Sequence, residues 1–180
     1  MEMWFSEFHT PDVKHSIRVN RQLYSKQSDY QRIDIFETPE FGRVLTLDGN
    51  VMLTERDEFI YDEMITHVPM AIHKEARDIL VIGAGDGGVV RELTRYDRVR
   101  HIDLVEMDPM VVEACRAYLP EMPEDKMRLY EVWLYSSVCE DLMHSRPLHP
   151  DHPPDDIFYW QIQTASNPQQ KSVCAPDKHG

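Results

Sequence analysis

Residues 78–92 read Asp78-Ile-Leu-Val-Ile-Gly-Ala-Gly-Asp-Gly-Gly-Val-Val-Arg-Glu92. The apolar run from Ile79 to Ile82 predicts a strand buried on both faces, as in a parallel sheet covered by helices. A helix is expected to begin near Val89, and the turn before it is rich in glycine: Gly83, Gly85, Gly87 and Gly88. Because glycine lets the backbone turn sharply and bring N–H groups close to a ligand, this pattern predicts a nucleoside-binding turn.

A second predicted strand, His101 to Val105, is followed by an acid, Glu106. The acid lies about 20 residues beyond the glycines, where Rossmann-like units place the carboxylate that binds ribose hydroxyls. A glycine turn alone can be purely structural, but the strand before it, the helix after it and the acid together favour a nucleoside site.

Two helices are expected around the second strand, at residues 89–95 and 109–119, and Pro109 suits the first turn of the latter. Strands that alternate with helices predict an α/β fold with a parallel sheet. A nucleoside would lie across the carboxyl ends of the two strands, at Ile82 and Val105.

The N-terminal residues 1–54 predict a small antiparallel β unit. Apolar alternation on either side of Asp48-Gly49 indicates a hairpin, because both residues tolerate the positive φ of a type I′ turn. Short strand material is also expected at residues 16–20 and 23–24.

A helix is predicted from Thr54, as a possible cap, to about Ala71. Its expected core face is the apolar stripe Ile60, Met64, Ile65 and Val68. Tyr61, Asp62 and Glu63 on this helix are polar neighbours of these apolar residues. They fit a functional role and a solvated face beside a core tyrosine equally well.

Composition narrows the class of protein. The chain has 180 residues, 42% of them hydrophobic, which suffices for a core. It contains no apolar run of membrane length and no signal-peptide pattern, so a cytoplasmic location is expected. The formal net charge of −13 argues against nucleic acid as a partner and suits a cationic substrate. Cys115, Cys139 and Cys174 are too widely spaced for a disulfide framework or a zinc site and are expected as reduced thiols.

The strand–turn–helix rhythm ends near Val132. Residues 127–131 could form a third strand, but residues 132–180 are rich in proline and polar side chains and predict an irregular tail. The His and Cys residues of this tail match no common metal-ligand spacing, so no metal is expected. Residues 55–131 would then form a partial Rossmann-like domain.

Several motifs resemble the polyamine aminopropyltransferases, and specifically spermidine synthases, over about residues 1–131. They are Tyr30-Gln-Arg-Ile-Asp-Ile-Phe36, Phe41-Gly-Arg-Val-Leu-Thr-Leu-Asp-Gly49, Thr54-Glu-Arg-Asp-Glu-Phe-Ile-Tyr-Asp-Glu-Met-Ile-Thr-His-Val-Pro69, Gly83-Ala-Gly-Asp-Gly-Gly88 and Val105-Glu-Met-Asp108. The resemblance implies transfer of an aminopropyl group from decarboxylated S-adenosylmethionine, a co-substrate, to putrescine, with no other cofactor. It also implies a homo-oligomer, a dimer or tetramer.

The resemblance assigns roles to individual residues. Glu106 would hold the ribose hydroxyls, and Asp86 would bind the amine of the aminopropyl chain and repel the carboxylate of ordinary S-adenosylmethionine. Gln31 would lie along the nucleoside and Tyr61 beside the putrescine channel. Asp62 stands where other members carry His or Gln, and an acid there would still attract a diamine.

The chemistry needs a carboxylate that accepts a proton from the attacking amine. The family carries it in an Asp-Ser/Cys-Thr-Asp-Pro segment, preceded by an Asp-Gly pair at the adenine, and neither is present here. One hypothesis is that the chain is truncated or frame-shifted near Val132 and inactive. The other is that the tail supplies a substitute base, for which the candidates are Asp155, Asp156 and Glu140.

Other classes fit the glycine-turn unit by itself. A methyltransferase that uses ordinary S-adenosylmethionine, or a nicotinamide-binding fragment, would show the same pattern, although Asp86 argues against the first. A non-catalytic subunit that pairs with a complete synthase is a further alternative.

Overall fold

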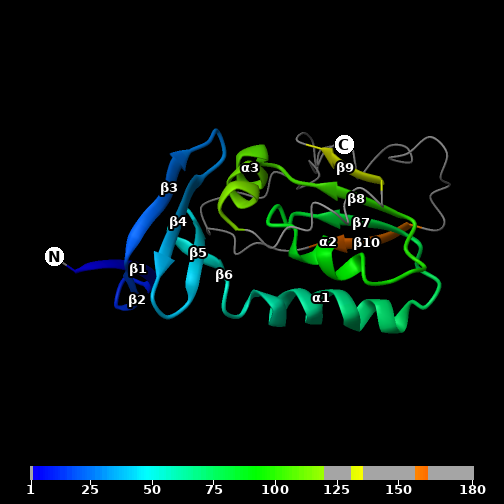
Figure 1. The fold of residues 1–180 in the computed structure, drawn as a ribbon, viewed down its shortest axis with the longest axis horizontal. Coiled ribbons are helices and arrows are strands. Elements are labelled where there is room, and N and C mark those ends of the chain that lie inside the picture. Colours follow the sequence, from blue (N-terminus) through cyan, green and yellow to red (C-terminus); the bar gives the residue numbers. More distant parts are fainter. Residues whose placement is uncertain (1, 120–130, 136–156, 162–180) are drawn as a thin grey trace, which may run out of the picture.

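The computed structural model describes residues 2–119 and the two strand backbones at 131–135 and 157–161. It has an N-terminal β unit and a parallel α/β sheet, with one helix between them and two helices under the sheet (Figure 1). This architecture agrees with the predicted fold class.

The N-terminal unit consists of two antiparallel sheets. A hairpin pairs β1 (Met3–Thr10) with β2 (Val13–Val19), and a four-stranded sheet follows in chain order. Its strands are β3 (Arg21–Gln27), β4 (Arg32–Thr38), β5 (Gly42–Leu47) and β6 (Asn50–Thr54). Asp48 and Gly49, between β5 and β6, have φ of 51° and 80°. The predicted hairpin is therefore confirmed, with both central residues in the left-handed region.

The second part begins with helix α1 (Glu58–Ile72). It is followed by β7 (Asp78–Ile82), α2 (Gly88–Leu93), β8 (His101–Val105) and α3 (Pro109–Tyr118). Strands β9 (Glu131–Tyr135) and β10 (Ile157–Gln161) complete a parallel sheet of order β10-β7-β8-β9. The predicted strand–turn–helix–strand–helix order from Asp78 to Tyr118 is confirmed.

Two strands correct the expectation of an irregular tail. β9 runs from Glu131 past the expected break at Val132, and β10 lies inside the segment 132–180, which was expected to be mostly irregular apart from a possible strand at residues 155–160. β10 pairs with the central strand β7, with Ile157 opposite Asp78 and Gln161 opposite Ile82. The pairing of β10 with β7 could not be read from the pattern, because the two strands lie far apart in the sequence.

The helices pack through two hydrophobic clusters, one on the parallel sheet and one on the N-terminal unit. On one face, α1 and α2 pack through Met70, Val89, Val90 and Leu93 against β7 and β8. In the second cluster, α3 packs against β4 and β5 of the N-terminal unit, with Cys115, a free thiol, fully buried. α3 thus lies between the two sheets and joins the two parts into one structure (Figure 1). No helix in the described part of the chain is long and apolar enough to cross a membrane.

The predicted core face of α1 is wrong in part. Ile65 packs against the core, but Ile60, Met64 and Val68 are 56%, 62% and 48% exposed. The residues that α1 buries are Asp62, Thr66 and Met70. The helix begins later than expected, after Asp57, and the Thr54 hydroxyl donates to the Asp57 carboxylate at 2.5 Å instead of capping the helix itself.

Two glycines of the β unit should respond differently to alanine. Gly49 has positive φ with open space around its Cα, so Gly49→Ala should cost only backbone strain, about 1 kcal/mol. Gly42 also has positive φ, and a Cβ there would collide with the Glu55 carboxylate, which accepts the Arg43 N–H at 2.7 Å. We expect Gly42→Ala to lower the free energy of unfolding in urea clearly more than Gly49→Ala. Equal losses would contradict the role given to Glu55.

Candidate functional site

The glycine-rich turn joins the carboxyl ends of β7 and β8. The N–H of Gly83 donates to the Val105 carbonyl at 2.7 Å, which ties the two strand ends together. Gly83, Ala84 and Gly87 have φ of 86°, 59° and 84°, so the backbone coils through the left-handed region three times in five residues. The turn therefore lies at the edge where parallel sheets bind ligands, as predicted.

Glu106 packs directly against this turn. One carboxylate oxygen accepts the N–H of Gly85 at 3.1 Å, and the other accepts the N–H of Asp108 at 3.0 Å. A Cβ on Gly85 would come within 2.8 Å of the first oxygen, so only glycine permits this approach. Burial raises the pKa of Glu106, while the backbone N–H groups oppose the rise. Each oxygen keeps lone-pair capacity for a further donor, such as a hydroxyl of a vicinal diol.

Asp108 connects the N-terminal unit to the turn. It is fully buried, and it caps α3 by accepting the Met110 N–H at 3.0 Å. Its other oxygen accepts the Ser28 hydroxyl at 2.6 Å and the Gln31 side-chain amide at 3.1 Å. Gln31, which precedes β4, is thereby linked to Glu106 through Asp108. Sequence reasoning missed Asp108 as a site residue, although an acid directly before Pro109 at a helix start is a recognisable capping signal.

Asp86 lies inside the turn and is half-buried. Its carboxylate accepts the N–H of Gly88, the first residue of α2, at 3.1 Å. Burial raises the pKa of Asp86, the charge of Glu58 raises it further, and the charge of Arg91 lowers it. The environment of Asp86 thus disfavours the charged carboxylate. A cationic ligand bound there would stabilise that charge.

Asp62 is the buried acid of α1, with 3% of its surface exposed. Its carboxyl fills the space that a Cβ would need on Gly88, and one oxygen lies 3.4 Å from a guanidinium nitrogen of Arg91. Burial, a hydrogen bond with Glu58 and the charges of Asp86 and Glu58 raise the pKa of Asp62 to about 9, although Arg91 opposes the rise. At neutral pH this side chain is therefore a carboxylic acid, packed between α1 and α2.

The predicted site residues come together unequally. Gly83, Gly85, Asp86, Glu106 and Gln31 form one group around the turn. Tyr61 is 53% exposed on α1, and its pKa is raised by burial and by the charges of Asp62 and Asp86. The side chain of Asp62 contacts Arg91 and Gly88, so it packs against the start of α2, where the glycine turn ends.

The candidate substitute bases Glu140, Asp155 and Asp156 lie outside the described residues.

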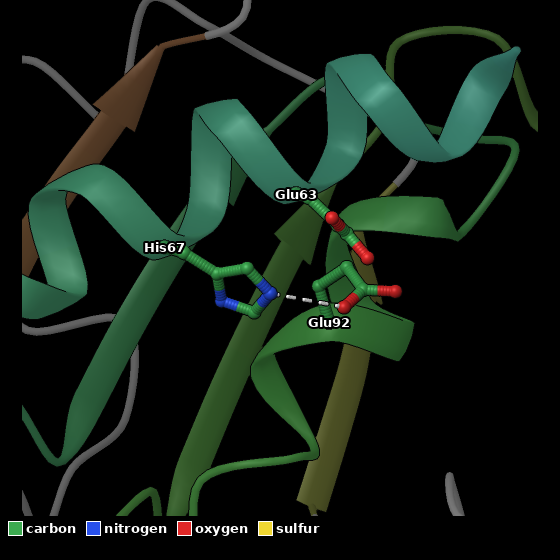
Figure 2. A group of neighbouring side chains, drawn as sticks. All are labelled: Glu63, His67 and Glu92. Carbon is green, nitrogen blue, oxygen red and sulfur yellow. Dashed lines mark ion pairs between the residues drawn. The ribbon is translucent and has the colours of Figure 1, made fainter.

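Three side chains have metal-ligand chemistry. Glu63 and His67 project from α1 toward Glu92 of α2, and their ligand atoms lie within 4.8 Å of one another (Figure 2). However, Glu92 already pairs with Arg91 at 3.0 Å and with Arg95 at 2.6 Å, and His67 Nε2 lies 3.2 Å from it. Burial alone would raise the pKa of Glu92, but Arg95 and Arg91 outweigh it and lower the pKa. Two guanidinium groups already neutralise Glu92, so we interpret this group as an ion-paired clasp between two helices.

Comparison with family models divides the chain as the structure does. A model described as the spermidine synthase tetramerisation domain matches residues 3–55, and one described as the spermine/spermidine synthase domain matches residues 58–140. The second match extends past residue 131, the expected end of the resemblance, and includes β9.

Comparison with relatives gives high identity over the same part. The polyamine aminopropyltransferase of Lachnoclostridium phytofermentans is 61% identical over 120 residues, which cover 67% of this chain and 42% of that protein. The one from Alkaliphilus oremlandii is 60% identical over 121 residues, 43% of its length. A crystal structure of Thermotoga maritima spermidine synthase superposes with a TM-score of 0.69 at 44% identity, covering 73% of this chain and 47% of that one. The chain therefore spans less than half the length of the relatives that it matches.

The protonated state of Asp62 should appear in the pH dependence of stability. The folded pKa is about 9, whereas an unfolded Asp titrates near 3.9. Between these values the folded chain holds a proton that the unfolded chain has lost, so stability should fall as pH rises through this window. Asp62→Asn mimics the protonated acid and should flatten this fall and raise stability at pH 8, as measured by urea unfolding between pH 5 and pH 9.

The matched control is Glu40→Gln, which removes an exposed ion pair with Arg56 and should leave the pH profile unchanged. An Asp62→Asn profile as steep as that of the parent chain would show that another group carries the dependence.

Proposed function

We propose that this chain, which belongs to the polyamine aminopropyltransferase family, binds decarboxylated S-adenosylmethionine at its glycine-rich turn. One observation carries the proposal. Two carboxylates with different proposed roles lie at the same turn. Glu106 is held by the N–H groups of Gly85 and Asp108, and Asp86 is held by the N–H of Gly88. The first suits the ribose diol and the second an ammonium group three carbons from the sulfonium.

The parts of the ligand match the chemistry of these side chains. A carboxylate accepts two hydrogen bonds from a vicinal diol, which accounts for Glu106. Asp86 would pair with the free amine of the aminopropyl chain. Ordinary S-adenosylmethionine carries a carboxylate on the same chain, and its approach to Asp86 would be repulsive, so charge supplies the discrimination. Gln31, anchored on Asp108, would border the nucleoside.

The complete reaction is the finer part of the proposal. Putrescine, bound beside Tyr61, would attack the carbon next to the sulfonium and give spermidine and methylthioadenosine. The attacking amine must lose a proton, and among the described residues we assign no base to this step. We therefore propose that the described part of this chain recognises the nucleoside. Aminopropyl transfer is proposed as the activity of a complete enzyme that contains such a part.

Assembly is a further element of the proposal. The match of residues 3–55 to a tetramerisation domain supports a homo-oligomer formed through the N-terminal β unit. The β1–β2 hairpin exposes Trp4, Phe8 and Val13, apolar side chains that an interface would cover. Pairing with a complete synthase would use the same surface, and a cytoplasmic location suits either assembly.

Binding measurements test the recognition step. By isothermal titration calorimetry, decarboxylated S-adenosylmethionine should bind more tightly than ordinary S-adenosylmethionine. Glu106→Gln should weaken all nucleosides about 10- to 100-fold, the value of a charged hydrogen bond of about 1.5–3 kcal/mol. Asp86→Asn should weaken decarboxylated S-adenosylmethionine, reduce its advantage over the ordinary form, and leave methylthioadenosine, which lacks the amine, unchanged.

The control is Glu37→Gln, which breaks an exposed pair with Arg21 far from the turn in sequence. Preference of the parent chain for ordinary S-adenosylmethionine would favour a methyltransferase-like site and sink the proposal. Methylthioadenosine release that requires putrescine would extend the proposal to full catalysis by this chain.

A further inference from the structure

A largely buried ion pair between Glu58 and Arg91 joins α1 to α2 near Asp86. The guanidinium of Arg91 donates to both carboxylate oxygens of Glu58, at 2.9 and 2.8 Å, and also approaches Asp62 at 3.4 Å. The side chains of Arg91 and Glu58 are only 19% and 13% exposed. A two-pronged pair of this kind fixes direction as well as distance, because guanidinium and carboxylate are both planar.

This pair is linked to Asp86 through the first turn of α2. Arg91 lies one helical turn beyond Gly88, whose N–H holds the Asp86 carboxylate. Asp62, in contact with Arg91, packs where the Cβ of Gly88 would be. A movement of Arg91 relative to α1 would therefore move the N–H that orients Asp86.

The same pair also acts on Asp86 by charge. Facing it are Glu58, Tyr61 and Asp62 from α1, Arg91 from α2 and Cys115 from α3, and Glu106 lies across Gly85. Within this set, Glu58 and Arg91 have opposite effects. Glu58 disfavours the charged form of Asp86 and Arg91 favours it.

We propose that Glu58 and Arg91 are specificity-determining positioning residues: together they orient Asp86 and set its charge, and so its preference for decarboxylated over ordinary S-adenosylmethionine. The inference rests on the proposed function, since it assigns Asp86 the task of meeting the amine. Neither Glu58 nor Arg91 touches the ligand in this proposal. They act by positioning Gly88, whose N–H binds Asp86, and through the electrostatic effect of their charges on Asp86.

The two partners make the proposal distinguishable from simple structural support. Loss of either partner breaks the Glu58–Arg91 pair, and loss of Arg91 also removes its pair with Glu92. A purely structural role therefore predicts that both variants shift the preference of Asp86 in the same direction. The charge role predicts opposite effects. Arg91→Gln removes a cation, so Asp86 should become protonated at higher pH and the preference for the amine should disappear at higher pH. Glu58→Gln removes an anion, so the preference should persist to lower pH.

The experiment measures the affinity ratio of decarboxylated to ordinary S-adenosylmethionine against pH, with methylthioadenosine as the amine-free reference. All variants carry Asp62→Asn, so that Asp62 cannot respond by changing its own protonation. We expect the midpoint of the ratio to move up by about half a pH unit or more in Arg91→Gln and down by a similar amount in Glu58→Gln. Arg91→Lys should restore the parent midpoint, because it keeps the charge.

Arg95→Gln is the matched control, because Arg95 lies in the turn after Arg91 and pairs with Glu92 and Glu63. Its midpoint should equal that of the parent. Shifts of the same sign in Arg91→Gln and Glu58→Gln, or no shifts, with methylthioadenosine still bound, would overturn this inference and leave the proposed function intact. Absence of any nucleoside binding by the parent chain would instead overturn the proposed function.

Discussion

The site depends on carboxyl groups packed directly against glycine backbone. Glu106 lies against Gly85 and Asp62 against Gly88, each in a space that a single Cβ would fill. Glycine therefore has two tasks in this turn. It permits the left-handed conformation at Gly83 and Gly87, and at Gly85 and Gly88 it admits an acid from a neighbouring element. Backbone N–H groups of the turn bind two acids, since Gly85 donates to Glu106 and Gly88 donates to Asp86, so the turn holds the groups that are proposed to hold the ligand.

A second consequence concerns the link between the two parts of the chain. Asp108 is a fully buried acid, and its hydrogen bonds to Ser28 and Gln31 cross from the α/β sheet to the N-terminal unit. The Asp108 N–H binds Glu106 at the same time. A buried acid without partners would cost several kcal/mol, so this network constrains the approach of the β unit to the sheet. The N-terminal unit is thus joined to the proposed nucleoside site, and it is also a candidate assembly surface.

The sequence predicted the parts of the fold that local chemistry determines. The glycine turn with its flanking strand and helix, the acid after β8 and the Asp48-Gly49 hairpin each have a local signal. The buried face of α1 does not follow from hydrophobic pattern, because Asp62 and Thr66 are buried where an apolar stripe was expected. Arg91, which pairs with Asp62 and Glu58, comes from an element 29 to 33 residues away. The place of β10 beside β7 is equally non-local, and so are the contacts of Asp108 with Ser28 and Gln31, which lie 80 and 77 residues earlier in the chain.

Charge balance explains why such an arrangement is suited to a cation. Glu58, Asp62, Asp86 and Glu92 are four acids near one guanidinium, that of Arg91. Arg91 pairs with Glu58 and Glu92, and Asp62 avoids its own charge by keeping a proton. Asp86 therefore shares the charge of Arg91 with other acids and relies on the backbone N–H groups of Gly88 and of Asp86 itself. Desolvation then works against the charge of Asp86. An ammonium group bound there, as proposed, would supply the missing positive charge, so part of its binding free energy would come from relieving a cost that the folded chain already bears. Ligands that stabilise the native state in this way also raise its resistance to unfolding. The free-energy cost of charging Asp86 and its proposed selectivity for an amine would then have the same physical cause, the desolvation of Asp86 in the turn.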